Sequence, residues 1–289
     1  MEKEGEAVKY YVVADVHGHF SVLKKELEKA GFFADKEPNK LIVCGDLLDR
    51  GTEAVKLIDF MMELLREDRL IFILGNHEDN FYSCMQEIAS GNIRRIAEGG
   101  SVHYINGTWG SILQIAGTNE SKMAKELSRK PGETLEEEKE RQKQVSKDLL
   151  KKVMASPFYK VLLTKGIDFY ETKNYIFVHG WIPCNIENAG SVNESFEYVP
   201  DWREREVWDW KRARWCNGMK LACDFSVKEP NKTIVCGHWH AAYGHAVYEK
   251  KGKERGEGSI HTPFYADGII AIDARTAESG EINCIVIED

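Results

Sequence analysis

Residues 41–51 read LIVCGDLLDRG. The apolar run at 41–43 predicts a buried β-strand, because short β-branched runs bounded by turn residues are typical of strands. The run leads into a glycine-bounded turn that carries Asp46, Asp49 and Arg50. Charged side chains are costly to bury without a partner. We therefore interpret this stretch as a strand that delivers ligand-binding side chains to its carboxyl end.

Other apolar runs along the chain end in polar residues in the same way. They lie at Val12 to Val13, Ile71 to Leu74, Tyr175 to Val178 and Thr233 to Val235. Amphipathic stretches at 21–30 and 52–65 separate the N-terminal runs and predict helices. This alternation predicts an α/β sheet, in which ligands gather beyond the carboxyl ends of the strands. The polar clusters are therefore expected to converge on one site.

Composition excludes several classes of function. The chain has 289 residues and a formal net charge of −8, which argues against general binding to nucleic acid or to an anionic membrane surface. No apolar stretch is long enough for a membrane span or a signal core, so we expect a cytoplasmic protein. The seven cysteines form no C-x-x-C pair, so we expect neither a disulfide framework nor a structural zinc site.

Two stretches interrupt the α/β pattern. From about residue 80 to 165 the sequence is polar and favours helix, and Thr134 and Glu137 are spaced as a capping box. We interpret it as a helical insertion with a solvated surface, within a single domain that spans residues 1–289. A second stretch, 185–225, interleaves tryptophans with arginines. Such residues can stack on a nucleobase, but packing of a loop onto its own domain is the favoured interpretation.

The polar clusters combine residue types that hold divalent cations. They are Asp15-Val16-His17, the turn at 45–51, Gly75-Asn76-His77-Glu78, His179-Gly180 and Gly237-His238-Trp239-His240. Carboxylate, amide and imidazole ligands together suit manganese, iron or zinc. Two such ions about 3.5–4 Å apart would polarise a phosphoryl oxygen and lower the pKa of a bridging water, which gives hydroxide for in-line attack. Arg50 is the first candidate to clamp a phosphate, since a guanidinium binds its oxygens in a bidentate manner.

The ordered set of motifs, which runs from Asp15 to His240, resembles the calcineurin-like metallophosphoesterases. It is most similar to the branch that holds serine/threonine phosphoprotein phosphatases and symmetrical diadenosine tetraphosphatases. The resemblance implies a four-layer αββα sandwich, with helices outside two facing mixed β-sheets and the metals at one end. The helical insertion and the tryptophan-rich stretch contribute little to it.

The resemblance also implies roles for single residues. One metal would be held by Asp15, His17 and Asp46, and the other by Asp46, Asn76, His179 and His238, with Asn76 also near the substrate. His77 would be the general acid, Asp49 would hold its imidazolium in place, and Arg50 would bind phosphate. Arg214 or Arg212 would supply a second phosphate-binding arginine.

The last motif departs from the phosphoprotein phosphatases. Those enzymes typically follow Gly-His with Thr-Pro or similar, whereas this chain continues with Trp239 and His240. The resemblance to the broader superfamily implies that His240 completes the shell of the first metal. The extra imidazole is shared with phosphodiesterases, nucleases and nucleotidases, so it weakens a simple protein-phosphatase label.

We therefore expect a hydrolase of phosphate esters that uses two divalent metal ions, with Mn²⁺ favoured and iron or Zn²⁺ possible. The leading hypothesis is a phosphomonoesterase that acts on a phosphoprotein or a small phosphorylated metabolite. The alternative is a symmetrical bis(5′-nucleosyl)-tetraphosphatase or another nucleoside polyphosphate hydrolase. A third hypothesis is a catalytically inert metal-binding interaction module. The sequence leaves open the substrate, the metal and the oligomeric state.

Overall fold

The first β-sheet contains the strands expected near residues 12, 41 and 71. The structure is a computed structural model that describes residues 8–188, 190 and 194–289. The sheet has the strand order β11-β1-β2-β3. Its strands are β1 (Lys9–Val13), β2 (Asn39–Cys44), β3 (Leu70–Ile73) and β11 (Ile285–Glu288). The first three are parallel, and β11 pairs with β1 in the antiparallel sense.

The second sheet contains the strands expected near residues 175 and 233. Its order is β4-β5-β8-β10-β9. The strands are β4 (Tyr170–Glu171), β5 (Tyr175–Phe177), β8 (Thr233–Cys236), β9 (Phe264–Ala266) and β10 (Ile269–Ala271). The central strands β5, β8 and β10 are parallel, while β4 and β9 form antiparallel edges. A separate hairpin pairs β6 (Cys184–Glu187) with β7 (Ser195–Tyr198).

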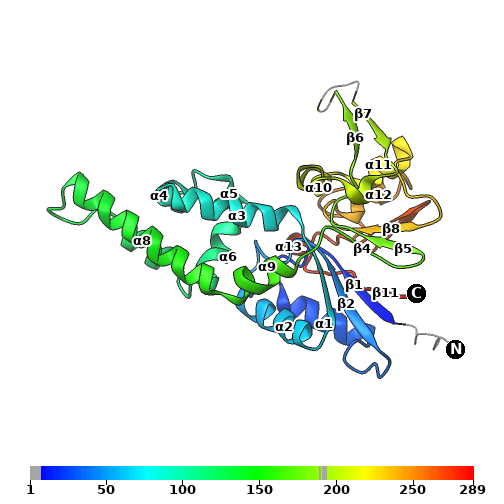
Figure 1. Ribbon diagram of the computed structural model, residues 1–289, viewed down its shortest axis with the longest axis horizontal. Helices are drawn as coiled ribbons and strands as arrows, with labels where there is room; N and C mark the ends of the chain where they lie inside the picture. Colours follow the sequence, from blue (N-terminus) through cyan, green and yellow to red (C-terminus); the bar gives the residue numbers. More distant parts are fainter. Residues whose placement is uncertain (1–7, 189, 191–193) are drawn as a thin grey trace.

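The two sheets pack face to face, with helices on their outer faces (Figure 1). Val12 and Ile42 of the first sheet meet Phe177 and Val235 of the second in a buried apolar layer. Helices α1 (Phe20–Ala30) and α2 (Ala54–Arg66) cover the outer face of the first sheet. Helices α11 (Gly218–Phe225) and α12 (Ala241–Val247) pack on the second. The expected four-layer αββα arrangement is confirmed.

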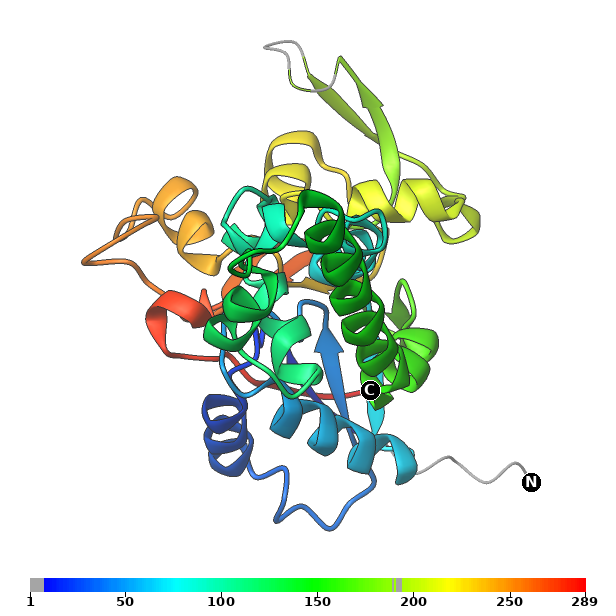
Figure 2. The same cartoon turned by 90° about the vertical axis from the view of Figure 1, so that its left-hand side faces the viewer.

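The segment between β3 and β4 is helical, and it faces the viewer in Figure 2. It contains α3 (Asn76–Ala89), α4 (Ile93–Ala97), α5 (Val102–Ile105), α6 (Thr108–Ile115), α7 (Glu120–Leu127), α8 (Leu135–Ala155), a π-helical turn (Phe158–Leu162) and α9 (Leu163–Lys165). Thr134 caps α8 and forms the expected capping box with Glu137. Phe81, Trp109 and Phe158 belong to the same apolar cluster as the outer face of the first sheet. The helical segment therefore shares a core with the sandwich, and the assignment of residues 1–289 to one domain stays a prediction.

The tryptophan-rich stretch contains a 3₁₀ turn (Trp202–Glu204) and α10 (Val207–Ala213). Trp202 and Trp210 are buried and pack on Phe169, as the packing interpretation predicted. Trp208 and Trp215 differ, because 73% and 53% of their surfaces are exposed. The remaining short helix is α13 (Thr276–Ser279). Within the described part of the chain, no helix combines the length and apolar character needed to cross a bilayer.

Glu171 forms ion pairs with Arg203 of the tryptophan-rich stretch and with Lys232. These ion pairs predict a pH-dependent contribution to stability. Arg203 donates to both carboxylate oxygens at 2.8 and 2.6 Å, and Lys232 Nζ lies 2.7 Å away. The bonds from Arg203 and Lys232 lower the pKa of Glu171 to about 2, below its ordinary value of 4.5. The stabilisation is therefore fully present above pH 4.5 and is lost as the pH falls toward 2.

We expect Glu171→Gln to lower the free energy of unfolding at pH 7 by about 1–2 kcal/mol. Urea denaturation between pH 7 and pH 3 measures the difference from the wild type, which should shrink below pH 4.5 as the Glu171 carboxylate of the unfolded chain is protonated. Glu257→Gln, at an exposed position, is the matched control. If the difference in unfolding free energy between Glu171→Gln and the wild type stays constant over this pH range, the role of the ion pairs is contradicted.

Candidate metal centre

The polar clusters converge at the carboxyl ends of parallel strands from both sheets. Asp15 follows β1, Asp46 follows β2, Asn76 follows β3, His179 follows β5 and His238 follows β8. The strands end at the same edge of the sandwich, so the turns after them meet in space.

Asp46 lies at the centre of the cluster and is 2% exposed. Its Oδ1 is 3.2 Å from Nε2 of His179, and its Oδ2 is 3.8 Å from Nε2 of both His17 and His77. The two oxygens of this carboxylate thus face different sets of ring nitrogens.

The ligand atoms form two groups that share Asp46. One atom each of His17, Asp46 and His77 lie within 4.8 Å of one another, and the same holds for Asp46, His179 and His238. Asn76 Oδ1 joins the second group at 2.8 Å from His179 Nε2. Mixed oxygen and nitrogen donors of this kind fit borderline divalent metals.

Hydrogen bonds orient two of the imidazoles for ligation. Nδ1 of His17 bonds the Leu48 carbonyl at 3.0 Å, and Nδ1 of His179 bonds the Cys44 carbonyl at 2.8 Å. A carbonyl accepts, so each Nδ1 carries the proton and each Nε2 presents a lone pair to the centre. Burial lowers the pKa of both rings and lowers that of His238 to about 3, so all are neutral ligands.

Asp15 adds a second buried carboxylate beside Asp46. Its Oδ2 accepts the backbone N–H of His238 at 2.9 Å. Burial, together with the carboxylates of Asp273 and Asp46, raises the pKa of Asp15 well above its ordinary value. Buried acidic groups of this kind are the surroundings that a bound cation relieves. The residues present therefore fit a pair of divalent cations.

The predicted general acid and its partner are in direct contact. Nδ1 of His77 lies 2.6 Å from Oδ2 of Asp49. Burial lowers the pKa of His77, but the carboxylates of Asp46 and Asp49 outweigh it and raise the pKa above its ordinary value. The guanidinium of Arg50 lies 3.0 Å from Nε2 of His17 and 3.3 Å from Nε2 of His77. The guanidinium therefore lies beside the first group of ligand atoms.

Other predicted site residues lie farther from the two groups. His240 Nε2 is 3.3 Å from Glu254 Oε1, and His240 is absent from both groups formed by the described residues. Arg214 is buried and donates to Asp79 at 2.7 Å and to Asp168 at 2.5 Å. Arg212 is exposed, 3.9 Å from Asp209. Ligation by His240 and phosphate binding by either arginine stay predictions.

Sequence reasoning missed Glu78. Its carboxylate accepts the N–H groups of Gly75, Asp46 and Leu47 at 2.6, 3.0 and 3.0 Å. It thereby ties the turn after β2 to the turn after β3. Burial raises its pKa to about 7. Glu78 stood in the quoted Gly-Asn-His-Glu motif, but its contacts depend on the second turn and leave no signal in the local pattern.

Asp273 was also missed. It is buried, follows β10, and lines a pocket together with Arg50 and His238. Burial raises the pKa of Asp273 to about 7. The apolar run at 269–272 that precedes it has the strand-then-acid pattern of the other clusters, so this residue had a usable signal.

The backbone of the centre is held in a strained conformation. Asp15, His17, Asp46 and His238 have φ values of 51°, 48°, 53° and 63°. Non-glycine residues in this left-handed region cost on the order of 1–3 kcal/mol each and persist only where surrounding structure enforces them. The surrounding fold therefore enforces the backbone conformation that directs these side chains to the centre.

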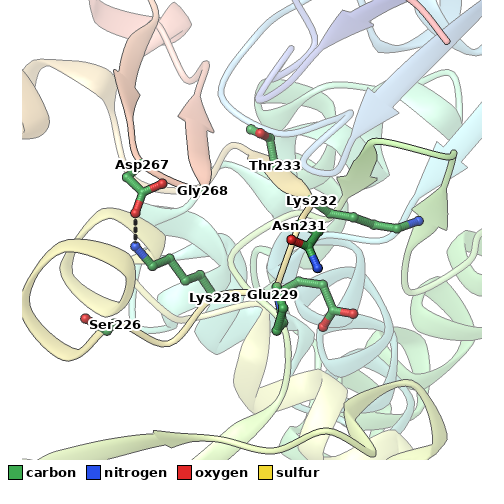
Figure 3. A pocket seen from close by; sticks show the side chains of 9 residues that line it. Ser226, Lys228, Glu229, Asn231, Lys232, Thr233, Asp267 and Gly268 are labelled. Atoms are coloured by element: carbon green, nitrogen blue, oxygen red, sulfur yellow. Dashed lines mark hydrogen bonds and ion pairs between the residues drawn. The ribbon is translucent and has the colours of Figure 1, made fainter.

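A pocket of about 230 Å³ opens beside the centre. It is lined by Arg50, His238, Trp239, His240, Arg255, Asp273, Arg275 and Glu278. A larger pocket, about 500 Å³, includes Thr233 and Gly268 and contains an ion pair between Lys228 and Asp267 (Figure 3). Thr233 begins β8, so this pocket lies at the opposite strand ends and is separate from the metal centre.

Residues 8–242 match the calcineurin-like phosphoesterase family. The chain belongs to this family. It is 40% identical over 68 residues to serine/threonine-protein phosphatase 1 of Salmonella typhimurium, across 24% of this chain and 29% of that protein. It is also 40% identical over 68 residues to the symmetrical bis(5′-nucleosyl)-tetraphosphatase of Hamiltonella defensa, across 24% and 23%. These alignments span less than a third of either relative.

An asymmetrical bis(5′-nucleosyl)-tetraphosphatase of Anoxybacillus flavithermus is 32% identical over 79 residues, across 25% of this chain and 32% of that protein. Among solved structures, a cold-active protein-tyrosine phosphatase of a Shewanella species has a TM-score of 0.43 and 16% identity, and covers 97% of this chain and 75% of that chain. Membership of the phosphoesterase family rests on the match over residues 8–242.

The close approach of Gly75 to Asp46 yields a test of the metal centre. A Cβ at Gly75 would lie 2.2 Å from Asp46 Oδ1 and 2.5 Å from the Asp46 backbone nitrogen. We expect Gly75→Ala to displace the shared carboxylate and to weaken manganese binding by about 10- to 100-fold, as for other residues that support metal ligands. Titration with manganese and elemental analysis after dialysis measure this.

Gly110→Ala is the matched control, because a Cβ there meets nothing within 4 Å. Gly110 lies inside α6, where alanine should raise stability by about 0.5–1 kcal/mol without changing manganese affinity. Equal affinity of Gly75→Ala and the wild type would contradict the central place given to Asp46.

Proposed function

We propose that this chain hydrolyses phosphate monoesters, in a phosphoprotein or a small phosphorylated metabolite, with two divalent cations. The observation that carries the proposal is the Asp46 carboxylate shared by two ligand groups, beside the hydrogen-bonded pair of His77 and Asp49. The match to the calcineurin-like phosphoesterases supports it. Mn²⁺ is the favoured metal, with iron or Zn²⁺ as alternatives that the donor types also suit.

We assign the ligands as the family resemblance implies; the first group also contains His77, which we keep as the acid, and Asp15 lies outside both groups formed by the described residues. His17 and Asp46, with Asp15 beside them, hold one cation, and Asp46, Asn76, His179 and His238 hold the other. Cations bound there would polarise the phosphoryl oxygens and supply hydroxide near neutral pH.

The chain's own residues handle the leaving group and the charge of the phosphate. Nδ1 of His77 donates to Asp49, so Nε2 faces the centre, where Arg50 contacts it. When Arg50 binds the phosphate instead, the Nε2–H of the imidazolium can protonate the leaving oxygen. The carboxylates that raise the pKa of His77 keep that proton available closer to neutral pH. Arg50 presents two nitrogens toward the same side of the centre and clamps two phosphate oxygens. Arg214, which two carboxylates hold in place, is the candidate for a second contact with the phosphate.

The role of His77 is tested by His77→Asn in protein loaded with manganese. We expect turnover of an aryl phosphate to fall by about 10²- to 10⁴-fold, the usual contribution of a general acid, while metal content stays at the wild-type level. Steady-state kinetics and elemental analysis measure the two effects. His261→Asn, a change outside the ligand groups, serves as the control. Unchanged turnover in His77→Asn would remove it as the acid.

A second candidate function, hydrolysis of a nucleoside polyphosphate, is favoured by aromatic rings at the rim of the centre. The ring of the exposed Trp215 lies 5.8 Å from that of His238, and an exposed tryptophan can stack on a nucleobase. Arg255 and Arg275 line the adjacent pocket, where they can bind further phosphates. Among the relatives are proteins named as bis(5′-nucleosyl)-tetraphosphatases.

Trp215→Ala separates the two candidates. If the substrate is a dinucleoside tetraphosphate, we expect this change to lower kcat/KM by about tenfold, since stacking contributes about 1–3 kcal/mol per base. Trp208→Ala is the matched control, because Trp208 is more exposed and lies against Lys211. Chromatography of the products gives the rate and the symmetry of cleavage. Rates for the dinucleotide far above those for aryl phosphate would displace the monoesterase proposal. Metal binding without hydrolysis of any substrate would favour the third hypothesis, a catalytically inert metal-binding interaction module.

A further inference from the structure

Helix α6 of the helical segment holds Asp49 at two points. Thr108 Oγ1 donates to Asp49 Oδ2 at 2.7 Å, and the same oxygen bonds Nδ1 of His77 at 2.6 Å. The Asp49 backbone N–H donates to Ser111 Oγ at 2.8 Å. Thr108 and Ser111 are fully buried, at 0% and 1% exposure. Both the carboxylate and the backbone of Asp49 are thus fixed by this helix.

The contact between α6 and the turn after β2 continues beyond Asp49. Gln114 accepts the N–H of Ala54 and donates to the carbonyl of Gly51, both at 3.0 Å. Thr108, Ser111 and Gln114 are spaced by three residues, so they share one face of the helix. At the start of this face, a Cβ at Gly107 would lie 2.3 Å from the backbone nitrogen of Arg50. The helix is therefore seated closely on the turn that carries Asp49 and Arg50.

We propose that Thr108 is a positioning residue for the general acid. The inference rests on the proposed function, in which His77 protonates the leaving oxygen. Two donors converge on Asp49 Oδ2, and the bond from Thr108 fixes the rotation of the carboxylate so that this oxygen meets Nδ1 of His77. The imidazole is then held with Nε2 toward the centre, where the leaving oxygen departs. Hydrogen bonds to a carboxylate are charge-assisted and strongly directional.

The dependence on the leaving group distinguishes positioning from mere anchoring of the helix. A poor leaving group needs a proton from the acid more than a good one does. Loss of positioning therefore slows phenyl phosphate more than 4-nitrophenyl phosphate and leaves KM unchanged. Loss of anchoring lowers the active fraction of protein and slows both esters equally.

The kinetic experiment uses the full chain loaded with manganese. Thr108→Val keeps the shape of the side chain and removes its donor, and we expect kcat for phenyl phosphate to fall about tenfold while kcat for the nitrophenyl ester falls less. Thr108→Ser should restore both rates. Thr164→Val is the matched control in the same helical segment, because the Thr164 hydroxyl bonds carbonyls of its own helical turn. Metal content should be equal in all variants.

A spectroscopic measurement tests the inference without relying on activity. In protein labelled with ¹⁵N-histidine, the Nδ1–H signal of His77 is identified by its loss in His77→Asn. We expect Thr108→Val to shift this signal and to speed its exchange with water. Thr108→Ser should keep the wild-type chemical shift and exchange rate. An unmoved signal, or an equal loss of rate with both esters, would overturn the inference. If Thr108→Val moves the signal but the wild-type protein hydrolyses no phosphate ester, the proposed function is rejected and the positioning of His77 by Thr108 is still supported.

Discussion

The buried, ionised carboxylate of Asp46 is the constraint on which the rest of the centre depends. Imidazole nitrogens of His17, His77 and His179 surround it, while the nearby Asp15 and Asp273 have raised pKa values. Neutral imidazoles and crowded acids do not satisfy one another, because each offers lone pairs and little positive charge. Divalent cations held by these residues would supply the missing charge, and this is the physical basis for proposing a metal centre.

The position of the centre follows from the packing of the two sheets. Asp46 is carried by the first sheet, and His179 and His238 are carried by the second. Their separation is set by the apolar layer in which residues such as Ile42 and Val235 interlock. Glu78 then fastens the turns after β2 and β3 to each other. The packing of the core therefore sets the geometry of the site.

The helical segment adds to the site from outside the sandwich. Its helix α6 contacts the turn that carries Asp49 and Arg50, and α3 contributes Asn76 and His77 at its first turn. The pocket beside the centre, with Arg255 and Arg275, lies on the side of the second sheet. The centre is thus bordered by the helical segment on one side and by this pocket on the other.

The sequence by itself determined the five strands β1, β2, β3, β5 and β8 and the polar residues that follow them, because an apolar run followed by acid, amide or imidazole is a local pattern. It also placed His77 and Asp49 as partners through the family resemblance. It did not predict the edge strands, the β6–β7 hairpin or β10 with Asp273 after it. Only the tertiary structure decided the rest. It brought Thr108 into contact with Asp49 and Glu78 into contact with the turn after β2. It also placed Arg214 between Asp79 and Asp168, and it left Trp215 exposed beside His238. Each of these depends on the direction of a side chain toward a segment distant in sequence, which no local pattern specifies.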